Sequence, residues 1–183
     1  MVEDSPLFKS AHSALLFAFH YSGQQSPKTA MGILMKGSPL GKGKGLSGLD
    51  GAAQAGMILF EFDKLDKYQR LVLLIRFGDV RHTCHCCGQL APSDEWLEAV
   101  DALSWAMGLE GYPRIVRHAM IERAVCRKKW DAKRLSEEHG ISDRTLRHQI
   151  KDIKDRVSKL ESKGLNALYY LLRGNGVCGD EIE

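Results

Sequence analysis

Apolar residues recur along this chain at intervals of three and four, which is the spacing of one face of an α-helix. The clearest series is Leu146, Ile150, Ile153, Val157 and Leu160. Residues 67–77 are apolar around nearly the whole circumference of a helix, so this segment is expected at the centre of the fold. No segment alternates apolar and polar residues convincingly, as a half-buried strand would. The pattern therefore predicts an all-α fold, a helical bundle.

Residues that start or stop helices give the expected limits of the other elements. Asp66 and Ser93 are placed to cap the segments that follow them, and Gly78 is placed to end one. Further helices are expected over 6–21, 47–62, 94–107, 114–129, 132–139 and 165–173. Residues 22–48 are rich in Gly and Pro and are expected to form a loop with room for one short helix.

Two of the expected helices are separated by only a few residues. The first carries Ala132 and Leu135 on one face and is stopped by Gly140, a residue suited to the left-handed conformation. Ile141 supplies an apolar side chain in the turn, and Ser142 is a natural N-cap for the second helix. This order is typical of a helix-turn-helix, here over 132–162, in which one helix supports another in the major groove of DNA. An ordinary helical hairpin with a solvated charged face is the alternative.

The second helix has a polar face opposite its apolar series. Arg144, Arg147, His148 and Lys151 lie on that face, and such side chains donate hydrogen bonds to guanine edges and phosphates. The charge is also uneven along the chain. Residues 113–173 hold 16 Lys and Arg against 8 Asp and Glu, whereas the remaining residues hold 10 against 15. We therefore expect two regions: residues 1–91, helical with the Gly/Lys loop and a cysteine cluster, and residues 92–183, helical and DNA-binding.

The cysteine cluster R-H-T-C-H-C-C-G lies between two expected helices. Cys84 and Cys87 have the C-x-x-C spacing that lets two thiolates bind one tetrahedral Zn²⁺, and the remaining ligands would come from His82, His85 or Cys86, or after folding from His118 or Cys126. We predict a small cysteine-rich insertion with a structural zinc ion. Buried thiols or a redox-active pair are the alternatives.

The composition gives expectations about location and activity. The longest uncharged apolar run, residues 71–75, is far shorter than a membrane span, and no basic segment precedes the first apolar patch as in a signal peptide. Five cysteines, three of them clustered, are not a secreted disulfide framework, so a cytoplasmic protein is expected. No catalytic triad, carboxylate pair or cofactor fingerprint is present, so we do not expect an enzyme.

Two segments resemble a known family. G-L-S-G-L-D-G-A-A-Q-A-G-M at 45–57 resembles a segment near the start of bacteriophage Q-type late antitermination proteins, which also carry a cysteine-rich zinc motif and a helical DNA-binding part. D-K-Y-Q-R-L-V-L-L-I-R-F-G-D at 66–79, with a later helix-turn-helix, is similar in style to sigma-factor region 4. The chain departs from the family in having one crowded cysteine cluster where two C-x-x-C pairs are usual.

The resemblance implies a protein that binds DNA near a phage late promoter and travels with the host RNA polymerase. DNA contacts would come from Ser142, Arg144, Thr145, Arg147, His148 and Lys151, and phosphate contacts from Arg127, Lys128, Lys129 and Lys133. The small-residue helix at 47–62 would contact the polymerase or mediate self-association. The alternatives are a helix-turn-helix repressor or activator acting at a promoter, and a zinc-stabilised helical adaptor that binds an acidic protein.

Overall fold

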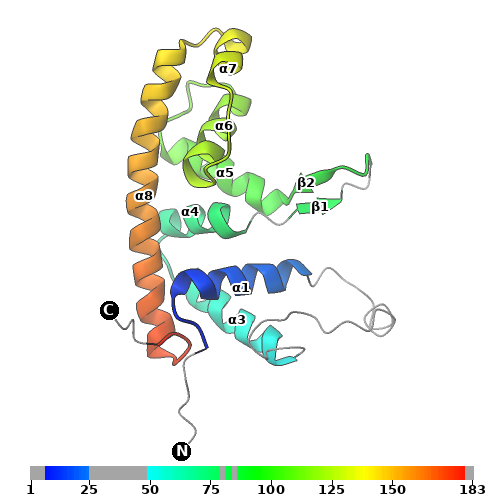
Figure 1. The fold of residues 1–183 in the computed structure, drawn as a ribbon, viewed down its shortest axis with the longest axis vertical. Helices are drawn as coiled ribbons and strands as arrows, with labels where there is room; N and C mark the ends of the chain where they lie inside the picture. The colour runs from blue at the N-terminus through cyan, green and yellow to red at the C-terminus, as the bar shows by residue number, and fades with distance from the viewer. Residues whose placement is uncertain (1–6, 25–48, 79–80, 84–85, 180–183) are drawn as a thin grey trace, which may run out of the picture. The chain divides into compact units, whose positions relative to one another are not determined.

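The computed structural model describes residues 7–24, 49–78, 81–83 and 86–179, and within them the fold is mostly helical (Figure 1). The helices are α1 (Ala11–Gln24), α3 (Leu49–Asp63), α4 (Lys67–Phe77), α5 (Asp94–Ala106), α6 (Arg114–Val125), α7 (Ala132–His139) and α8 (Asp143–Gly174). The strands are β1 (Arg81–Thr83) and β2 (Leu90–Pro92). None of the described helices is both long and apolar enough to cross a membrane.

The chain divides into two compact units. Unit 1 holds the described residues up to Leu65 together with those from Leu165 onward, and unit 2 holds Asp66–Gly164. The division expected from the sequence, between residues 91 and 92, differs from this one. The reason is that α4, which precedes residue 91, packs on α5 and α6, which follow it.

The core of unit 2 is built around Trp96 on α5. This side chain is 1% exposed, and its indole Nε1 donates a hydrogen bond to the carbonyl oxygen of Ile75 on α4 at 3.1 Å. One cluster contains buried apolar side chains from each of α4, α5, α6, α7 and α8. Arg76 adds a hydrogen bond between α4 and α6, because its Nη1 donates to the carbonyl oxygen of Val125 at 3.0 Å. Residues 67–77 are expected at the centre of the fold; the structure shows that they form α4 and contribute Val72 and Ile75 to the core of unit 2.

The predicted helix caps of unit 2 are confirmed as well. The Asp66 side chain accepts a hydrogen bond from the Tyr68 N–H at 3.0 Å, and Ser93 Oγ accepts one from the Trp96 N–H at 3.3 Å. Gly78 ends α4, with its N–H donating to the carbonyl oxygen of Leu74. These caps pair backbone groups that the helices leave without partners.

Three local expectations are wrong. β1 and β2 form an antiparallel pair, with Thr83 opposite Leu90, although no strand was expected, because three-residue strands are too short to show alternation. The helix expected from residue 6 begins at Ala11, since Phe8 instead forms a parallel bridge with Cys178. No separate helix covers 165–173, because α8 is continuous through Gly164. A Cβ at Gly164 would lie 3.0 Å from Leu73 Cδ1, so this glycine allows α4 to approach α8.

Unit 1 joins the beginning of the described chain to its end. Leu168 and Leu172 of α8 are fully buried, and the Phe8 N–H donates to the carbonyl oxygen of Val177 at 3.1 Å. Helices α1 and α3 pack closely against each other, and the rings of Phe19 and Phe62 meet edge to face at 5.5 Å. Unit 1 is therefore a core of α1, α3 and the last turns of α8.

The contact between α1 and α3 depends on a glycine, which gives a testable prediction. A Cβ at Gly51 would lie 2.6 Å from the Tyr21 ring, whereas a Cβ at Gly56 would meet nothing within 4 Å. Alanine is favoured over glycine inside a helix by about 0.5–1 kcal/mol, so Gly56→Ala is expected to raise the free energy of unfolding by about that amount. Gly51→Ala is expected to gain less than Gly56→Ala, because the added methyl group must displace the far end of the Tyr21 side chain. Denaturant unfolding of both variants measures the difference, and an equal gain in the two would contradict the close contact.

Candidate nucleic-acid interface

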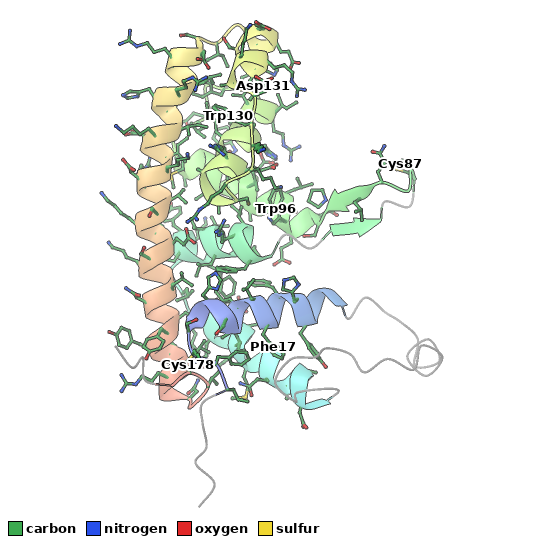
Figure 2. All side chains as sticks on the ribbon, in the orientation of Figure 1. Phe17, Cys87, Trp96, Trp130, Asp131 and Cys178 are labelled. Carbon is green, nitrogen blue, oxygen red and sulfur yellow. The ribbon has the colours of Figure 1, made fainter. Side chains whose placement is uncertain are left out.

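Helices α7 and α8 are joined by a three-residue turn. The Asp131 side chain caps α7 by accepting a hydrogen bond from the Arg134 N–H at 3.1 Å, and both Trp130 and Asp131 are labelled in Figure 2. Gly140 ends α7 in the left-handed conformation, with φ 63°. The carbonyl oxygen of Ser142 accepts the N–H of Leu146 at 3.0 Å, which begins the hydrogen bonding of α8. The left-handed turn at Gly140 predicted from the sequence is confirmed.

The rotation of α8 about its own axis is set by its apolar face. Leu146, Ile150, Ile153 and Val157 are each at most 6% exposed and belong to the core cluster of unit 2. From α7, Ala132 and Leu135 are also buried. Replacing a buried leucine or isoleucine by alanine typically lowers the free energy of unfolding by about 2–5 kcal/mol. The opposite face of α8 is therefore held outward by several strong contacts.

All six residues predicted to contact DNA at the start of α8 are placed by the structure at or near its surface. Ser142, Arg144, Thr145, Arg147, His148 and Lys151 are all exposed. Arg144, His148 and Lys151 are spaced by four and three residues, so they share the side of α8 that lies opposite the buried series. Three side chains that can donate hydrogen bonds thus lie along the first turns of one exposed helix face.

Arg147 stands apart from these three because it has an acidic partner. Its Nε lies 2.7 Å from Asp143 Oδ2, one turn earlier on the same helix. The hydrogen bond that Arg147 donates to Asp143, together with the negative charge of that carboxylate, raises the pKa of Arg147 above its ordinary value. Both side chains are exposed, so the pair adds little to stability and can be exchanged for another anion.

The segment between α6 and α7 carries three of the residues predicted to contact phosphates. Arg127 has φ 56°, and its carbonyl oxygen and that of Lys128 both accept hydrogen bonds from Arg123 Nη1, at 3.3 and 2.9 Å. Lys128 is engaged within unit 2, since its Nζ lies 2.9 Å from Glu122 Oε2 and 5.1 Å from the centre of the Trp96 ring. Lys129 and Arg127 are exposed. Arg127 and Lys129 therefore remain the accessible cations of this segment.

Lys133, the fourth of these residues, lies in the first turn of α7. Its side chain is 83% exposed, and its Nζ lies 3.8 Å from Glu137 Oε1. Next to α7 a pocket of about 820 Å³ opens, and Arg123, Lys129 and Arg134 contribute to its wall. Glu122 and Asp131 line the same pocket, so the linker and the start of α7 carry charges of both signs.

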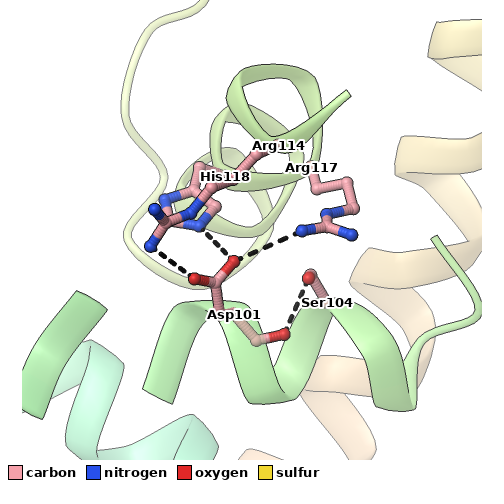
Figure 3. A network of polar contacts seen from close by, with 5 residues as sticks. All are labelled: Asp101, Ser104, Arg114, Arg117 and His118. Carbon is pink, nitrogen blue, oxygen red and sulfur yellow. Dashed lines mark hydrogen bonds and ion pairs between the residues drawn. The ribbon is translucent and has the colours of Figure 1, made fainter. Parts of the chain in front are cut away.

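A cluster of polar contacts centred on Asp101 joins α5 to α6 (Figure 3). His118 Nε2 lies 2.7 Å from Asp101 Oδ1, Arg117 Nη2 lies 3.4 Å from the same oxygen, and Arg114 donates to Oδ2. Arg117 is 8% exposed, and its guanidinium lies 4.7 Å from the centre of the Trp105 ring. No motif in the sequence indicates this cluster. The cluster fixes α6, the helix that precedes the α6–α7 linker, against α5.

The electrostatics of this cluster give a pH-dependent prediction. Partial burial would raise the pKa of Asp101, but the hydrogen bonds and charges of His118 and Arg114 lower it below its ordinary value. A carboxylate with a lowered pKa stabilises the fold above the pKa of the unfolded chain, about 3.9, and this stabilisation is lost as pH falls through the folded pKa. Asp101→Asn is therefore expected to lower the free energy of unfolding by about 1–2 kcal/mol at pH 7, with the difference shrinking below about pH 4.

Urea unfolding of the two proteins across pH measures this difference. Asp152→Asn is the matched control, because that carboxylate is exposed on α8 and its substitution is expected to change stability little. A wild-type advantage that stays constant down to pH 2 would contradict the role given to the Asp101 charge.

The predicted zinc ligands lie only partly in the described chain. Cys86 and Cys87 are exposed in the turn between β1 and β2, next to Gly88 with φ 69°. Cys84, His85 and the side chain of His82 lie outside the described residues. Within the described part of the chain, no group of three or more His, Cys, Asp or Glu could hold a metal ion.

Two ligands that were considered from elsewhere in the chain have other contacts. His118 binds Asp101, and Cys126 Sγ donates to the carbonyl oxygen of Ile75 at 3.4 Å. A zinc ion bound within the cysteine cluster itself stays a prediction. We expect about one zinc per chain in protein purified without chelators, because the C-x-x-C spacing suits a tetrahedral site. Cys84→Ser should lower the content measured by mass spectrometry and Cys178→Ala should not; a metal-free wild-type protein would contradict the site.

No protein-family model matches the chain, and no curated protein sequence matches it.

Proposed function

We propose that the protein is a DNA-binding transcription regulator in which α7 and α8 act as a helix-turn-helix. The observation that carries this proposal is the exposed row Arg144, His148 and Lys151, held outward by the buried apolar series of the same helix. A helix about 10–12 Å wide fits the major groove, where guanidinium and ammonium groups reach guanine O6 and N7. The first turns of α8 are the part that would enter the groove, with Ser142, Thr145 and Arg147 beside this row.

The contacts to the DNA backbone follow from the same placement. Arg127, Lys129 and Lys133 are exposed near the start of α7, where the first helix of a helix-turn-helix crosses the backbone. Lys128 would contribute less, because it already binds Glu122 and lies against Trp96. These cations would set the register of the protein on DNA without reading its sequence.

The finer proposal is a bacteriophage late-gene antitermination factor that acts on host RNA polymerase. It is supported by the resemblance of residues 45–57 and 66–79 to Q-type proteins. A promoter-bound repressor or activator uses the same DNA surface without an elongating polymerase, and it is the second candidate.

DNA binding is tested with a duplex isolated from a random library by the wild-type protein. Arg144→Ala is expected to weaken binding to this duplex by about 1–3 kcal/mol and to relax the preference at one base pair. Lys151→Ala is expected to weaken binding and to lower the slope of affinity against salt by about 1. Lys163→Ala is the control, since that lysine is exposed on the same helix three turns beyond Lys151. Unchanged affinity in both Arg144→Ala and Lys151→Ala would contradict the proposed surface.

Antitermination is tested separately, by transcription with purified bacterial RNA polymerase through an intrinsic terminator. The template carries the selected duplex near the promoter, and a matched template lacks it. Read-through is expected only with the duplex present, and Arg144→Ala should abolish it. Specific DNA binding with unchanged termination would favour the promoter-bound regulator.

A further inference from the structure

Helix α3 has two apolar faces, and the described residues of unit 1 bury only one of them. Ala55, Ile58 and Phe62 are buried, at 4%, 0% and 5% exposure. On the other side Phe60 is 64% exposed and Met57 is 47% exposed, and Ala53 and Gly56 are exposed beside them. Single exposed apolar residues are ordinary, but a large pair on adjacent turns of one helix indicates a contact surface.

The exposed residues follow the spacing of a helix-pairing seam. Asp50, Ala53, Met57, Phe60 and Lys64 are separated by three, four, three and four residues. This is the heptad spacing by which one α-helix packs lengthwise on another. Gly56 lies next to the seam, and a Cβ there would meet no atom within 4 Å, so the surface has an open notch at its middle.

We propose that this α3 face binds the α3 face of a second copy of the chain, with the two helices antiparallel. Side-chain size favours this occupant and this direction. The small residue Ala53 lies four residues before Met57, and the large residue Phe60 lies three residues after it. An antiparallel two-fold therefore places each Phe60 against the Ala53 region of the other copy, and such an interface uses the same patch twice. A parallel pair would set Phe60 against Phe60.

Charge favours the same arrangement. Asp50 and Lys64 each lie seven residues from Met57 in opposite directions: Asp50 is in the first turn of α3, about 10.5 Å along the helix axis, and Lys64 directly follows the last helical residue, Asp63. In the antiparallel pair, Asp50 of one copy therefore lies opposite Lys64 of the other at both ends of the seam. A parallel pair would place like charges opposite each other. The face is thus complementary to itself in one orientation only.

The environment of Lys64 is compatible with this role. Its Nζ binds Glu61 Oε1 at 2.7 Å and lies 4.4 Å from the centre of the Phe60 ring, so the ammonium group sits at the edge of the seam. An ammonium group has three donors, so one bond to Glu61 leaves others for a carboxylate of the second copy. A pair of fifteen-residue helices is a small interface, so association is expected at micromolar chain concentrations.

The full chain is tested by sedimentation velocity over a range of concentrations, with circular dichroism of every variant as a measure of folding. The wild type is expected to dimerise, and Phe60→Glu to raise the dimer dissociation constant more than about tenfold, because it buries a charge within the seam. Ile115→Glu is the matched control, since Ile115 on α6 is 60% exposed in unit 2. That variant should associate like the wild type.

A charge exchange tests the direction and the register. Asp50→Lys and Lys64→Asp are each expected to raise the dissociation constant about tenfold, because each places like charges at both ends of the interface. The double variant should restore the wild-type dissociation constant. A local effect of either substitution on α3 alone would instead persist in the double variant. A wild-type chain that stays monomeric at about 100 µM would overturn the proposal. So would single variants that weaken association while the double variant fails to restore it. The dimer does not depend on the DNA-binding proposal, because neither Phe60→Glu nor the charge exchange alters α7 or the first turns of α8.

Discussion

The burial of four side chains on one face of α8 is the constraint on which the proposed DNA surface depends. Leu146, Ile150, Ile153 and Val157 are held in the core of unit 2, so the helix cannot rotate without exposing them. Everything on the opposite face is then presented outward as a consequence of packing. The left-handed turn at Gly140 also positions this surface, because it fixes where α7 ends and α8 begins. A reading surface needs no rigidity of its own when its helix is anchored in this way.

Less of the positive charge in residues 113–173 is accessible to a ligand than the composition indicates. Residues 113–173 carry an excess of basic residues, yet several of these cations already face a carboxylate. Arg147 binds Asp143, Arg134 lies 3.3 Å from Glu138, and Lys128 binds Glu122. The Arg147 and Arg134 pairs are exposed and span one helical turn, so a phosphate can replace the carboxylate at little cost, whereas Lys128 and Glu122 are half-buried. In the protein without DNA, the Arg147 and Arg134 side chains would thus stay at the surface and remain able to bind phosphate.

Local chemistry was predictable from the sequence, and distant contacts were not. Asp66, Ser93 and Gly140 act within one turn of their own position, so their roles can be recognised from neighbouring residues. Gly164 shows the opposite case: a separate helix was expected directly after it, whereas α8 continues through it and its missing Cβ leaves room for Leu73, which lies far away in the chain. The Asp101 cluster was missed for the same reason, because no spacing within either helix reveals which side chain the other helix brings to it. The DNA-contacting residues stay a prediction, although their exposure is as expected.

The composition of unit 1 has a consequence for synthesis. Phe8 is bonded to Val177 and Gly179, and the buried residues Leu168 and Leu172 belong to the same unit as α1 and α3. Unit 2 is continuous in the chain, so it can fold as soon as residues 66–164 have left the ribosome. The first helices must wait until residues 165–179 emerge before their apolar faces are covered. During that interval unit 1 is incomplete, and the nascent chain is most exposed to chaperones and proteases.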